Sequence, residues 1–268
     1  MSRSVVIVDA VRTPFGKAGS LYAGTRADDL IVRAIRGLLE RNPKVDPKTI
    51  DDVAIAAATQ SGDQGMNIGR SAALLSGLPN SVPGYSIDRW CAGALTAVTT
   101  VAGSIAMGAY DVAIAGGVEH MGNHPMGEGV DPNPRYLAEK IVSTDALAMG
   151  NTAENLVEKY NISREDQDKF SYWSQMKATK AQENGRLAKE IITIKIPQRK
   201  KDPIQFSKDE FVKPMTSLAV LGNLRPAFKK EGGSVTAGNS SGLNDGAAAT
   251  IIASEKAVKK YNLKPIAR

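Results

Sequence analysis

The chain of 268 residues has one cysteine, Cys91, in the stretch "SIDRWCAGALTAV", where an extended run gives way to a long helix of small residues. The thiolate is the reactive form of cysteine, and the free N–H groups at a helix N-terminus favour it. The small residues Ala92, Gly93 and Ala94 leave room for an acyl group to approach. The pattern indicates a nucleophile that forms a covalent acyl intermediate. The alternative is a buried thiol that packs as a small apolar side chain.

The two histidines, His120 and His124, are the natural candidates for activating a thiol. His120 ends an expected strand, on the side where the sites of parallel sheets usually open, and His124 lies in the loop after it. The alternative for each is a histidine without a catalytic role. A single cysteine excludes a cysteine-based zinc site, and two histidines leave little material for any other metal site.

A second cluster, "AGNSSGLNDGAAA" at 237–249, offers backbone amides and hydroxyl groups to a ligand, or forms an ordinary turn before a strand. It lacks the Gly-Lys-Ser/Thr of a P-loop. The net charge of +6 is concentrated at 198–202, 228–232 and 257–261, which indicates solvated surface or attraction of an anionic ligand.

Composition limits the partners and the compartment. Aromatic residues make up 5% of the chain and are not interleaved with the basic runs, so nucleic acid is not favoured as a partner. The N-terminus has no signal-peptide core, and we expect no apolar run long enough to span a bilayer. The lone cysteine suits a reducing compartment, and we therefore expect a cytoplasmic protein.

Apolar periodicity predicts the elements that position these residues. Strands are expected at 4–15, 51–59, 83–88 and 110–121, and helices at 26–43, 67–79 and 91–107. This alternation favours a mostly parallel sheet covered on both faces. From Met121 the sequence indicates mainly loops and helices, with a capping box at Ser163 and Asp166 and a strand at 190–197. Near Gly233 the pattern of a glycine- and serine-rich turn, an apolar strand and a helix resumes. This indicates an insertion into the α/β unit.

With these residues in view, the chain resembles the thiolase family along its whole length. The motifs that carry the resemblance are "DAVRTPFGK", "DRWCAGALTAV", "IAGGVEHM", "MGNTAEN", "SREDQDKFSYWSQMKA", "LRPAF" and "VTAGNSSGLNDGAAA". The resemblance implies an α/β N-terminal domain with a mixed five-stranded sheet covered by helices, and an inserted helical loop domain. It divides the chain into 1–120 and 233–268 for the N-terminal domain, and 121–232 for the loop domain that binds coenzyme A.

The family's G-H-P, C-x-G-x-G and N-E-A-F motifs, which belong to its C-terminal catalytic domain, do not occur here. We therefore expect that domain to be missing, through truncation or because it is a separate polypeptide. The resemblance implies a homodimer or tetramer for the intact enzyme.

The resemblance also implies a reaction. Cys91 attacks a 3-ketoacyl-CoA, acetyl-CoA leaves, and a second CoA takes the acyl group; the reverse is a Claisen condensation to acetoacetyl-CoA. Coenzyme A is a substrate, and no cofactor is expected. Without the activating base, the isolated chain is expected to have little activity. The alternatives are a non-catalytic CoA-binding or assembly fragment and, as a third class, a hydrolase that pairs Cys91 with His120.

Three further site residues follow from the resemblance alone. Lys213 falls where the family usually has an arginine near the adenine and phosphate end of CoA; lysine keeps the charge but loses stacking on the purine. Ser241 matches the serine beside the pantetheine arm, and Met149 lies in the segment that lines the acyl pocket. Ala148 stands where acetoacetyl-CoA thiolases tend to have histidine, which favours longer or more varied acyl chains. His120 stands where the family commonly has serine, so no role transfers to it.

Overall fold

A computed structural model describes residues 3–143 and 148–268. The chain divides into two compact units, which are described one at a time. The first comprises the residues up to Gly129 together with Leu187–Glu210 and Leu243–Arg268, and the second comprises Val130–Arg186 and Phe211–Gly242. The sequence prediction placed the insertion at 121–232; in the structure, residues 187–210 group with the sheet unit.

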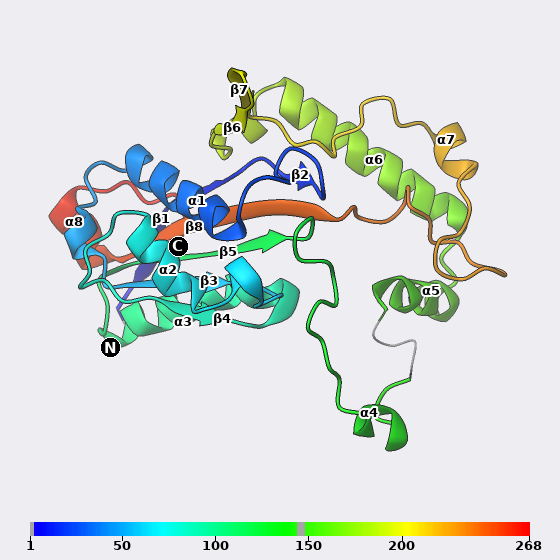
Figure 1. The fold of residues 1–268 in the computed structure, drawn as a ribbon, viewed down its shortest axis with the longest axis horizontal. Coiled ribbons are helices and arrows are strands. Elements are labelled where there is room, and N and C mark those ends of the chain that lie inside the picture. The colour runs from blue at the N-terminus through cyan, green and yellow to red at the C-terminus, as the bar shows by residue number, and fades with distance from the viewer. Residues whose placement is uncertain (1–2, 144–147) are drawn as a thin grey trace. The chain divides into compact units, whose positions relative to one another are not determined.

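A mixed sheet forms the centre of the first unit (Figure 1). Its strands are β1 (Val5–Arg12), β2 (Gly16–Lys17), β3 (Asp52–Ala56), β4 (Tyr85–Ile87), β5 (Val112–His120) and β8 (Asn244–Ser254). The order is β1-β8-β5-β3-β4, with the short β2 paired to β8. This five-stranded path confirms the predicted fold class.

The directions of the strands refine one expectation. β3 is parallel to β4 and β5, but β8 is antiparallel to both β1 and β5. The alternation of strands and helices predicted a mostly parallel sheet, and β1, β3, β4 and β5 do run in one direction, whereas β8, inserted between β1 and β5, runs in the opposite direction. β8 starts at the end of the sheet where β5 stops, since Asp245 pairs with His120, and it therefore runs back along β5.

Helices cover both faces of this sheet (Figure 1). They are α1 (Ala27–Arg41), α2 (Ile68–Leu75), α3 (Gly93–Met107) and α8 (Glu255–Tyr261), with short 3-10 turns η1 (Pro47–Thr49), η2 (Gly62–Gln64), η3 (Trp90–Ala92) and η5 (Leu187–Lys189). Val53 and Ile55 of β3 belong to the core that contains α1 and α2 residues, whereas Ala54 belongs to a second core with α3 residues. Because successive side chains of a strand point to opposite faces, α1 and α3 lie on opposite sides of the sheet.

Helix α3 is apolar but only partly covered. Its buried stripe, at four-residue spacing, consists of Gly93, Ala97, Val101 and Ile105. The stretch Trp90–Met107 has a mean hydropathy of 1.4 over its 18 residues, and 22% of this stretch is buried inside the structure. By length and composition alone, it is long and apolar enough to cross a membrane. The expectation that no apolar run reaches this length was therefore wrong. In the structure the small residues of the stripe pack α3 onto the sheet.

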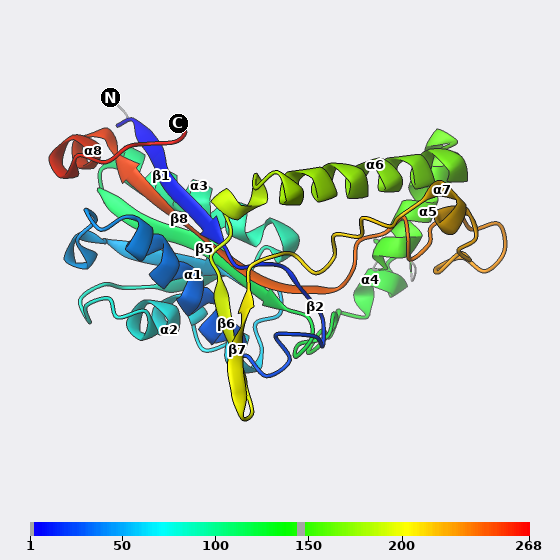
Figure 2. The ribbon, with the colours of Figure 1, turned by 90° about the horizontal axis from the view of Figure 1, so that it is seen from above.

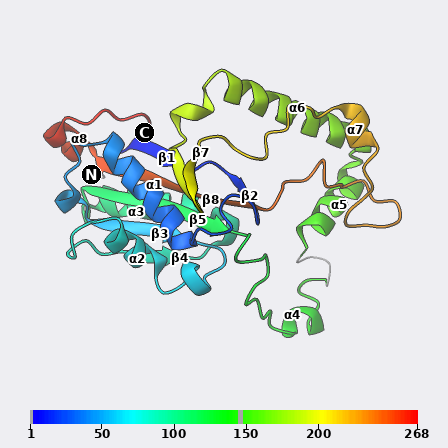
Figure 3. The ribbon, with the colours of Figure 1, turned by 45° about the horizontal axis from the view of Figure 1, so that its top comes forward.

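A hairpin of β6 (Ile194–Gln198) and β7 (Lys201–Phe206) lies beside α1 (Figure 3). Ile194 and Phe206 are buried in the same core as the α1 side chains. Arg12 at the end of β1 holds both sides of this segment, because it donates to Glu190 before the hairpin and to Asp209 after it. These contacts explain why residues 187–210 belong to the sheet unit.

The second unit is mainly helical (Figure 2). It contains α4 (Arg135–Ala138), α5 (Met149–Tyr160), the long helix α6 (Arg164–Glu183) and α7 (Leu218–Gly222). At the start of α6, Ser163 Oγ accepts a hydrogen bond from the Asp166 amide at 3.1 Å and donates to Asp166 Oδ2 at 2.8 Å. The predicted pairing of these two residues at a helix start is confirmed.

Candidate functional site

Cys91 lies in the turn η3, between β4 and α3, and its side chain is exposed. The preceding residue, Trp90, has a φ of 50°, which is a rare backbone conformation for a bulky side chain. Asp88 Oδ1 accepts a hydrogen bond from the Trp90 amide at 3.1 Å, and the Arg89 carbonyl accepts one from the Ala92 amide at 3.1 Å. The thiol thus sits on a sharp turn that hydrogen bonds on both sides hold in place.

Two glycines bring this turn close to the sheet. A Cβ atom at Gly93 would lie 2.8 Å from the Ala56 Cβ atom at the end of β3. A Cβ atom at Gly117 of β5 would lie 3.0 Å from the Ala94 Cβ atom. The first turn of α3 therefore rests on the carboxyl ends of β3 and β5, which is where ligands bind in open α/β sheets.

The start of α3 carries backbone N–H groups, of which the Gly93 amide already donates to the Trp90 carbonyl. In the described part of the chain, no side chain caps its N-terminus, at Ala92. The N–H groups of a first helical turn lack partners within the helix and carry partial positive charge. An oxygen that develops negative charge next to Cys91 would be stabilised by such groups.

His120 is not available to Cys91. Its side chain is 0% exposed, its Nε2 atom lies 3.0 Å from the Tyr22 carbonyl, and its Nδ1 atom accepts a hydrogen bond from the Asn123 amide at 3.1 Å. Both ring nitrogens are therefore occupied, with the proton on Nε2. This arrangement removes the support for a hydrolase that pairs Cys91 with His120.

His124 is held between two carboxylates. Its Nε2 atom lies 2.6 Å from Asp63 Oδ1, and its Nδ1 atom lies 2.9 Å from Glu128 Oε2. Burial on its own lowers the pKa of His124, but the hydrogen bonds to Asp63 and Glu128 outweigh it and raise the pKa above the ordinary value. Its ring nitrogens hold a loop in place and are not free for a thiol.

Lys213 and Ser241 lie in the second unit, on two loops that meet. Both side chains are exposed. The Lys213 ammonium lies 5.5 Å from the centre of the Phe211 ring. That ring packs against the backbone of Gly242, where a Cβ atom would lie 2.1 Å from the Phe211 Cζ atom. The Lys213 ammonium and the Ser241 hydroxyl group therefore belong to two segments that contact each other through Phe211 and Gly242.

The loop before Ser241 is organised by its own polar side chains. Thr236 Oγ1 accepts hydrogen bonds from the Gly238 and Asn239 amides at 3.1 and 3.2 Å, and Asn239 Oδ1 accepts one from the Thr236 amide at 2.7 Å. The Asn239 side chain also donates to Asp168 of α6 at 3.1 Å. Asn239, one of the polar residues that the sequence offered to a ligand, therefore builds the turn instead.

Met149 begins α5 and is 61% exposed. The next residue, Gly150, lies under the Phe228 ring, where a Cβ atom would be 2.0 Å from the Phe228 Cδ1 atom. One turn later, Glu154 is 4% exposed and accepts hydrogen bonds from the Ser234 and Val235 amides at 3.0 and 2.8 Å. Glu154 belongs to the "MGNTAEN" motif, but its role as a buried acceptor was not predicted. A glycine four residues before a glutamate, on one helical face, was the available signal.

The four predicted site residues fall in different units: Cys91 in the first, and Lys213, Ser241 and Met149 in the second. Within residues 3–143 and 148–268, no group of three or more His, Cys, Asp or Glu side chains is arranged to hold a metal ion.

Comparison with known proteins adds to this geometry. The family described as "Thiolase, N-terminal domain" matches residues 5–256. A β-ketoadipyl-CoA thiolase of Acinetobacter baylyi is 43% identical over 98% of this chain and 69% of its own length. A probable acetyl-CoA acyltransferase of Staphylococcus epidermidis is 41% identical over 100% of this chain and 70% of its own length.

A solved structure is similar to this chain in both fold and sequence. The crystal structure of the Bacillus anthracis acetyl-CoA acetyltransferase matches with a TM-score of 0.86 at 37% identity, over 98% of this chain and 68% of that one. The fold, the exposed thiol at the strand ends and these matches lead to one conclusion. The chain belongs to the thiolase family and covers the part of it that contains the N-terminal domain.

Proposed function

We propose that Cys91 is the acyl carrier of a thiolase that cleaves 3-ketoacyl-CoA. One observation carries the proposal: the thiol is exposed on a constrained turn at the carboxyl ends of β3 and β5, beside the uncapped start of α3. A buried apolar cysteine, the alternative from sequence, would not be presented in this way.

In the proposed reaction, the Cys91 thiolate attacks the 3-keto carbonyl carbon and the carbonyl oxygen takes up negative charge. The bond between C2 and C3 then breaks, and the acetyl-CoA carbanion takes a proton as it leaves. The thiol of a second CoA attacks the acyl thioester, which releases the Cys91 thiolate. His120 and His124 have no free ring nitrogen, so the proton transfers are assigned to groups other than these two.

We propose that the second unit binds the CoA. Lys213 would attract a phosphate as a point charge, Ser241 would contact the pantetheine arm, and Met149 would line the acyl pocket. The exposure of all three and the packing of Phe211 on Gly242 support this assignment. Ala148, before Met149, supports acceptance of longer or more varied acyl chains.

The wider setting is also a proposal. The relatives act on β-ketoadipyl-CoA or are acetyl-CoA acyltransferases by name, which supports a 3-ketoacyl-CoA substrate here and a place in fatty acid metabolism. We propose a cytoplasmic enzyme that needs no cofactor besides its substrate CoA and forms a homodimer or tetramer. The second candidate is a non-catalytic CoA-binding or assembly fragment. It is supported by the fact that Lys213, Ser241 and Met149 all belong to the second unit, whereas Cys91 belongs to the first.

Intact-mass spectrometry tests the role of Cys91. Incubation with acetyl-CoA or acetoacetyl-CoA should add one acetyl group, which peptide mapping places on Cys91 and which Cys91→Ala lacks. Iodoacetamide should label Cys91 quickly, and CoA should slow the labelling. Lys213→Gln should raise the CoA concentration needed for protection, whereas Lys208→Gln, an exposed lysine in the first unit, should not.

Two outcomes distinguish the candidates. CoA protection without any acyl adduct would favour the non-catalytic CoA-binding fragment. An acyl adduct on a residue other than Cys91 would overturn the proposed mechanism.

A further inference from the structure

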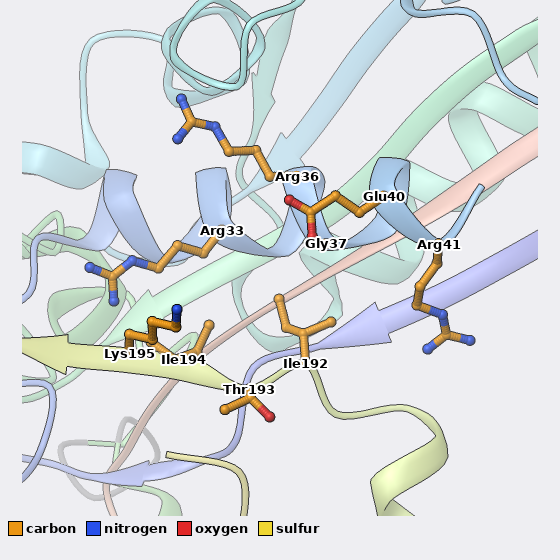
Figure 4. Close-up of a pocket in the computed structure, with 9 residues that line it drawn as sticks. All are labelled: Arg33, Arg36, Gly37, Glu40, Arg41, Ile192, Thr193, Ile194 and Lys195. Atoms are coloured by element: carbon orange, nitrogen blue, oxygen red, sulfur yellow. The ribbon is translucent and has the colours of Figure 1, made fainter. Parts of the chain in front are cut away.

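A cavity of about 530 Å³ lies between the outer face of α1 and the strand β6, entirely within the first unit (Figure 4). The α1 residues that line it recur at the spacing of one helical face: Arg33, Arg36, Gly37, Glu40 and Arg41. From the hairpin segment, Ile192, Thr193, Ile194 and Lys195 complete the lining.

The middle of the cavity is shaped by Gly37. A Cβ atom at this position would lie 2.9 Å from the Ile192 Cδ1 and Cγ2 atoms. The Ile192 side chain therefore packs directly on the helix backbone, and it gives the cavity an apolar floor between charged ends. This close packing fixes the spacing between the helix and the hairpin.

The positive charges of the lining exceed its negative charges. Arg41 is engaged elsewhere, by an ion pair with Asp9 at 3.0 Å and a hydrogen bond to the Lys189 carbonyl at 2.9 Å. Arg36 donates to the Leu75 carbonyl at 2.6 Å and pairs with no carboxylate within residues 3–143 and 148–268. Among the described residues, neither Arg33 nor Lys195 has an ion-pair partner, and Arg33 Nη1 is a buried nitrogen without a hydrogen-bond partner.

Glu40 is the carboxylate among the residues that line the cavity, against these three unpaired cations. Figure 4 shows Arg33 and Lys195 reaching the same end of the cavity, away from Arg41. The Arg33 Nη1 atom is enclosed by protein, so contacts to a ligand would come from the other N–H groups of the Arg33 guanidinium and from the Lys195 ammonium. A guanidinium fork and an ammonium point charge together suit the oxygens of a phosphate group.

The cavity is separate from the proposed reaction site. It lies on the outer surface of α1, whose core contacts include Val53 and Ile55, whereas α3 and its Cys91 turn pack on the other face of the sheet with Ala54. An anion bound here would not touch the thiol.

We propose that this cavity binds a small molecule through a phosphate or diphosphate group, with Arg33 and Lys195 as the anion-binding residues and Ile192 beneath its apolar part. The ligand is distinct from the CoA assigned to the second unit. The proposal does not depend on the role of Cys91.

Isothermal titration of the protein with inorganic phosphate and with pyrophosphate tests this proposal. We expect saturable binding, tighter for pyrophosphate, and an increase in melting temperature with ligand concentration. Arg33→Gln and Lys195→Gln should each raise the Kd about tenfold, as expected for the loss of one charge-assisted hydrogen bond. Arg33→Lys should retain part of the affinity. If Arg33→Gln does not fold, Arg33→Lys replaces it as the test of this position.

Two variants serve as controls. Lys48→Gln removes one positive charge at an exposed site in η1, and Lys213→Gln removes the charge assigned to CoA binding. Both should bind pyrophosphate like the unmodified protein. The proposal is wrong if Lys48→Gln weakens binding as much as Lys195→Gln, if Lys213→Gln abolishes binding, or if millimolar pyrophosphate gives neither heat nor stabilisation.

Discussion

His124 Nε2 lies 2.6 Å from Asp63 Oδ1, and this contact connects the loop after β5 to the turn η2. The other carboxylate oxygen of Asp63 accepts a hydrogen bond from the Ala27 amide at 3.1 Å. On the far side of the ring, Glu128 binds His124 Nδ1 and also accepts from the Ser61 hydroxyl at 3.0 Å. A protonated His124 can donate to both carboxylates at once, whereas a neutral ring can donate to only one.

This arrangement predicts a pH-dependent free energy of unfolding. Burial opposes the ionisation of Asp63, but hydrogen bonds from His124 and the Ala27 amide keep its pKa below the ordinary value; the hydrogen bond from His124 also lowers the pKa of Glu128. Because the pKa of His124 is raised, its contribution is complete below its unfolded pKa of about 6.5 and is lost as the pH rises through the folded value. The carboxylate contributions are lost as the pH falls below about 4.

Denaturant unfolding of the native protein and His124→Gln, between pH 5 and 8.5, measures this effect. The stability difference should be largest near pH 5.5 and should shrink as the pH rises. A difference that stays constant over this range would contradict the protonated bridge. The chain has two histidines, so the ring signals that disappear in His124→Gln assign the NMR titration of His124.

Asp209→Asn should loosen the β6–β7 hairpin. Arg12 binds Asp209 through two hydrogen bonds, at 2.7 and 3.0 Å, and Asp209 also accepts from the Phe15 amide at 2.7 Å. The change removes one of the two carboxylates that pair with the largely buried Arg12, and Glu190 remains, so the loss of charge-assisted hydrogen bonds should cost about 1.5–3 kcal/mol in the free energy of unfolding. Glu139→Gln, which breaks the exposed pair with Arg135, should cost less than about 0.5 kcal/mol. Equal effects of the two changes would contradict this assignment.

Gly93→Ala should disturb the thiol turn. The new Cβ atom would lie 2.8 Å from the Ala56 Cβ atom, so the start of α3 must move away from β3, at a cost of about 1–3 kcal/mol. We expect an altered rate of iodoacetamide labelling at Cys91. Gly103→Ala is the matched control, because its Cβ atom meets nothing within 4 Å and should stabilise the same helix by about 0.5–1 kcal/mol. Unchanged labelling in Gly93→Ala would argue against control of the thiol by this contact.

Glu154→Ala should destabilise the second unit. The change leaves the Ser234 and Val235 amides without their acceptor, and a buried unsatisfied donor costs about 1–3 kcal/mol. Because this segment leads into the loop of Ser241, CoA protection of Cys91 should also weaken. Glu158→Ala, on the same helix, loses only an exposed ion pair with Lys229 and should leave both properties unchanged. CoA protection that persists fully in Glu154→Ala would contradict the link.

Local patterns in the sequence predict the elements and several of their ends. The spacing of apolar residues predicts one face of α1, and its members Leu30, Ile31, Ala34, Ile35 and Leu38 are buried, whereas Leu39 at its end is half-buried. The pairing of Ser163 with Asp166 was also visible, because a helix start depends on a few neighbouring residues. The strand-to-helix corner at Cys91 follows from the same kind of signal.

Other features depend on contacts between distant residues and could not be predicted in this way. The position of β8 between β1 and β5 follows from pairing across more than a hundred residues, which no local period records. The φ of 50° at Trp90 is not a preference of tryptophan, and it occurs in the same turn as the packing of Gly93 on Ala56. The buried acceptor role of Glu154 needs Val235, a residue far along the chain.

The place of β8 in the sheet also has a consequence for synthesis of the protein on the ribosome. β1 is the first strand made, yet its neighbour in the sheet, β8, ends at Ser254. At about 5–20 residues per second, β1 waits on the order of ten seconds or more for its partner. During that time the edges of β1 and β5 that β8 will cover are open to pairing with other chains. The nascent chain should therefore depend on a chaperone that shields these strands until residue 254 has emerged.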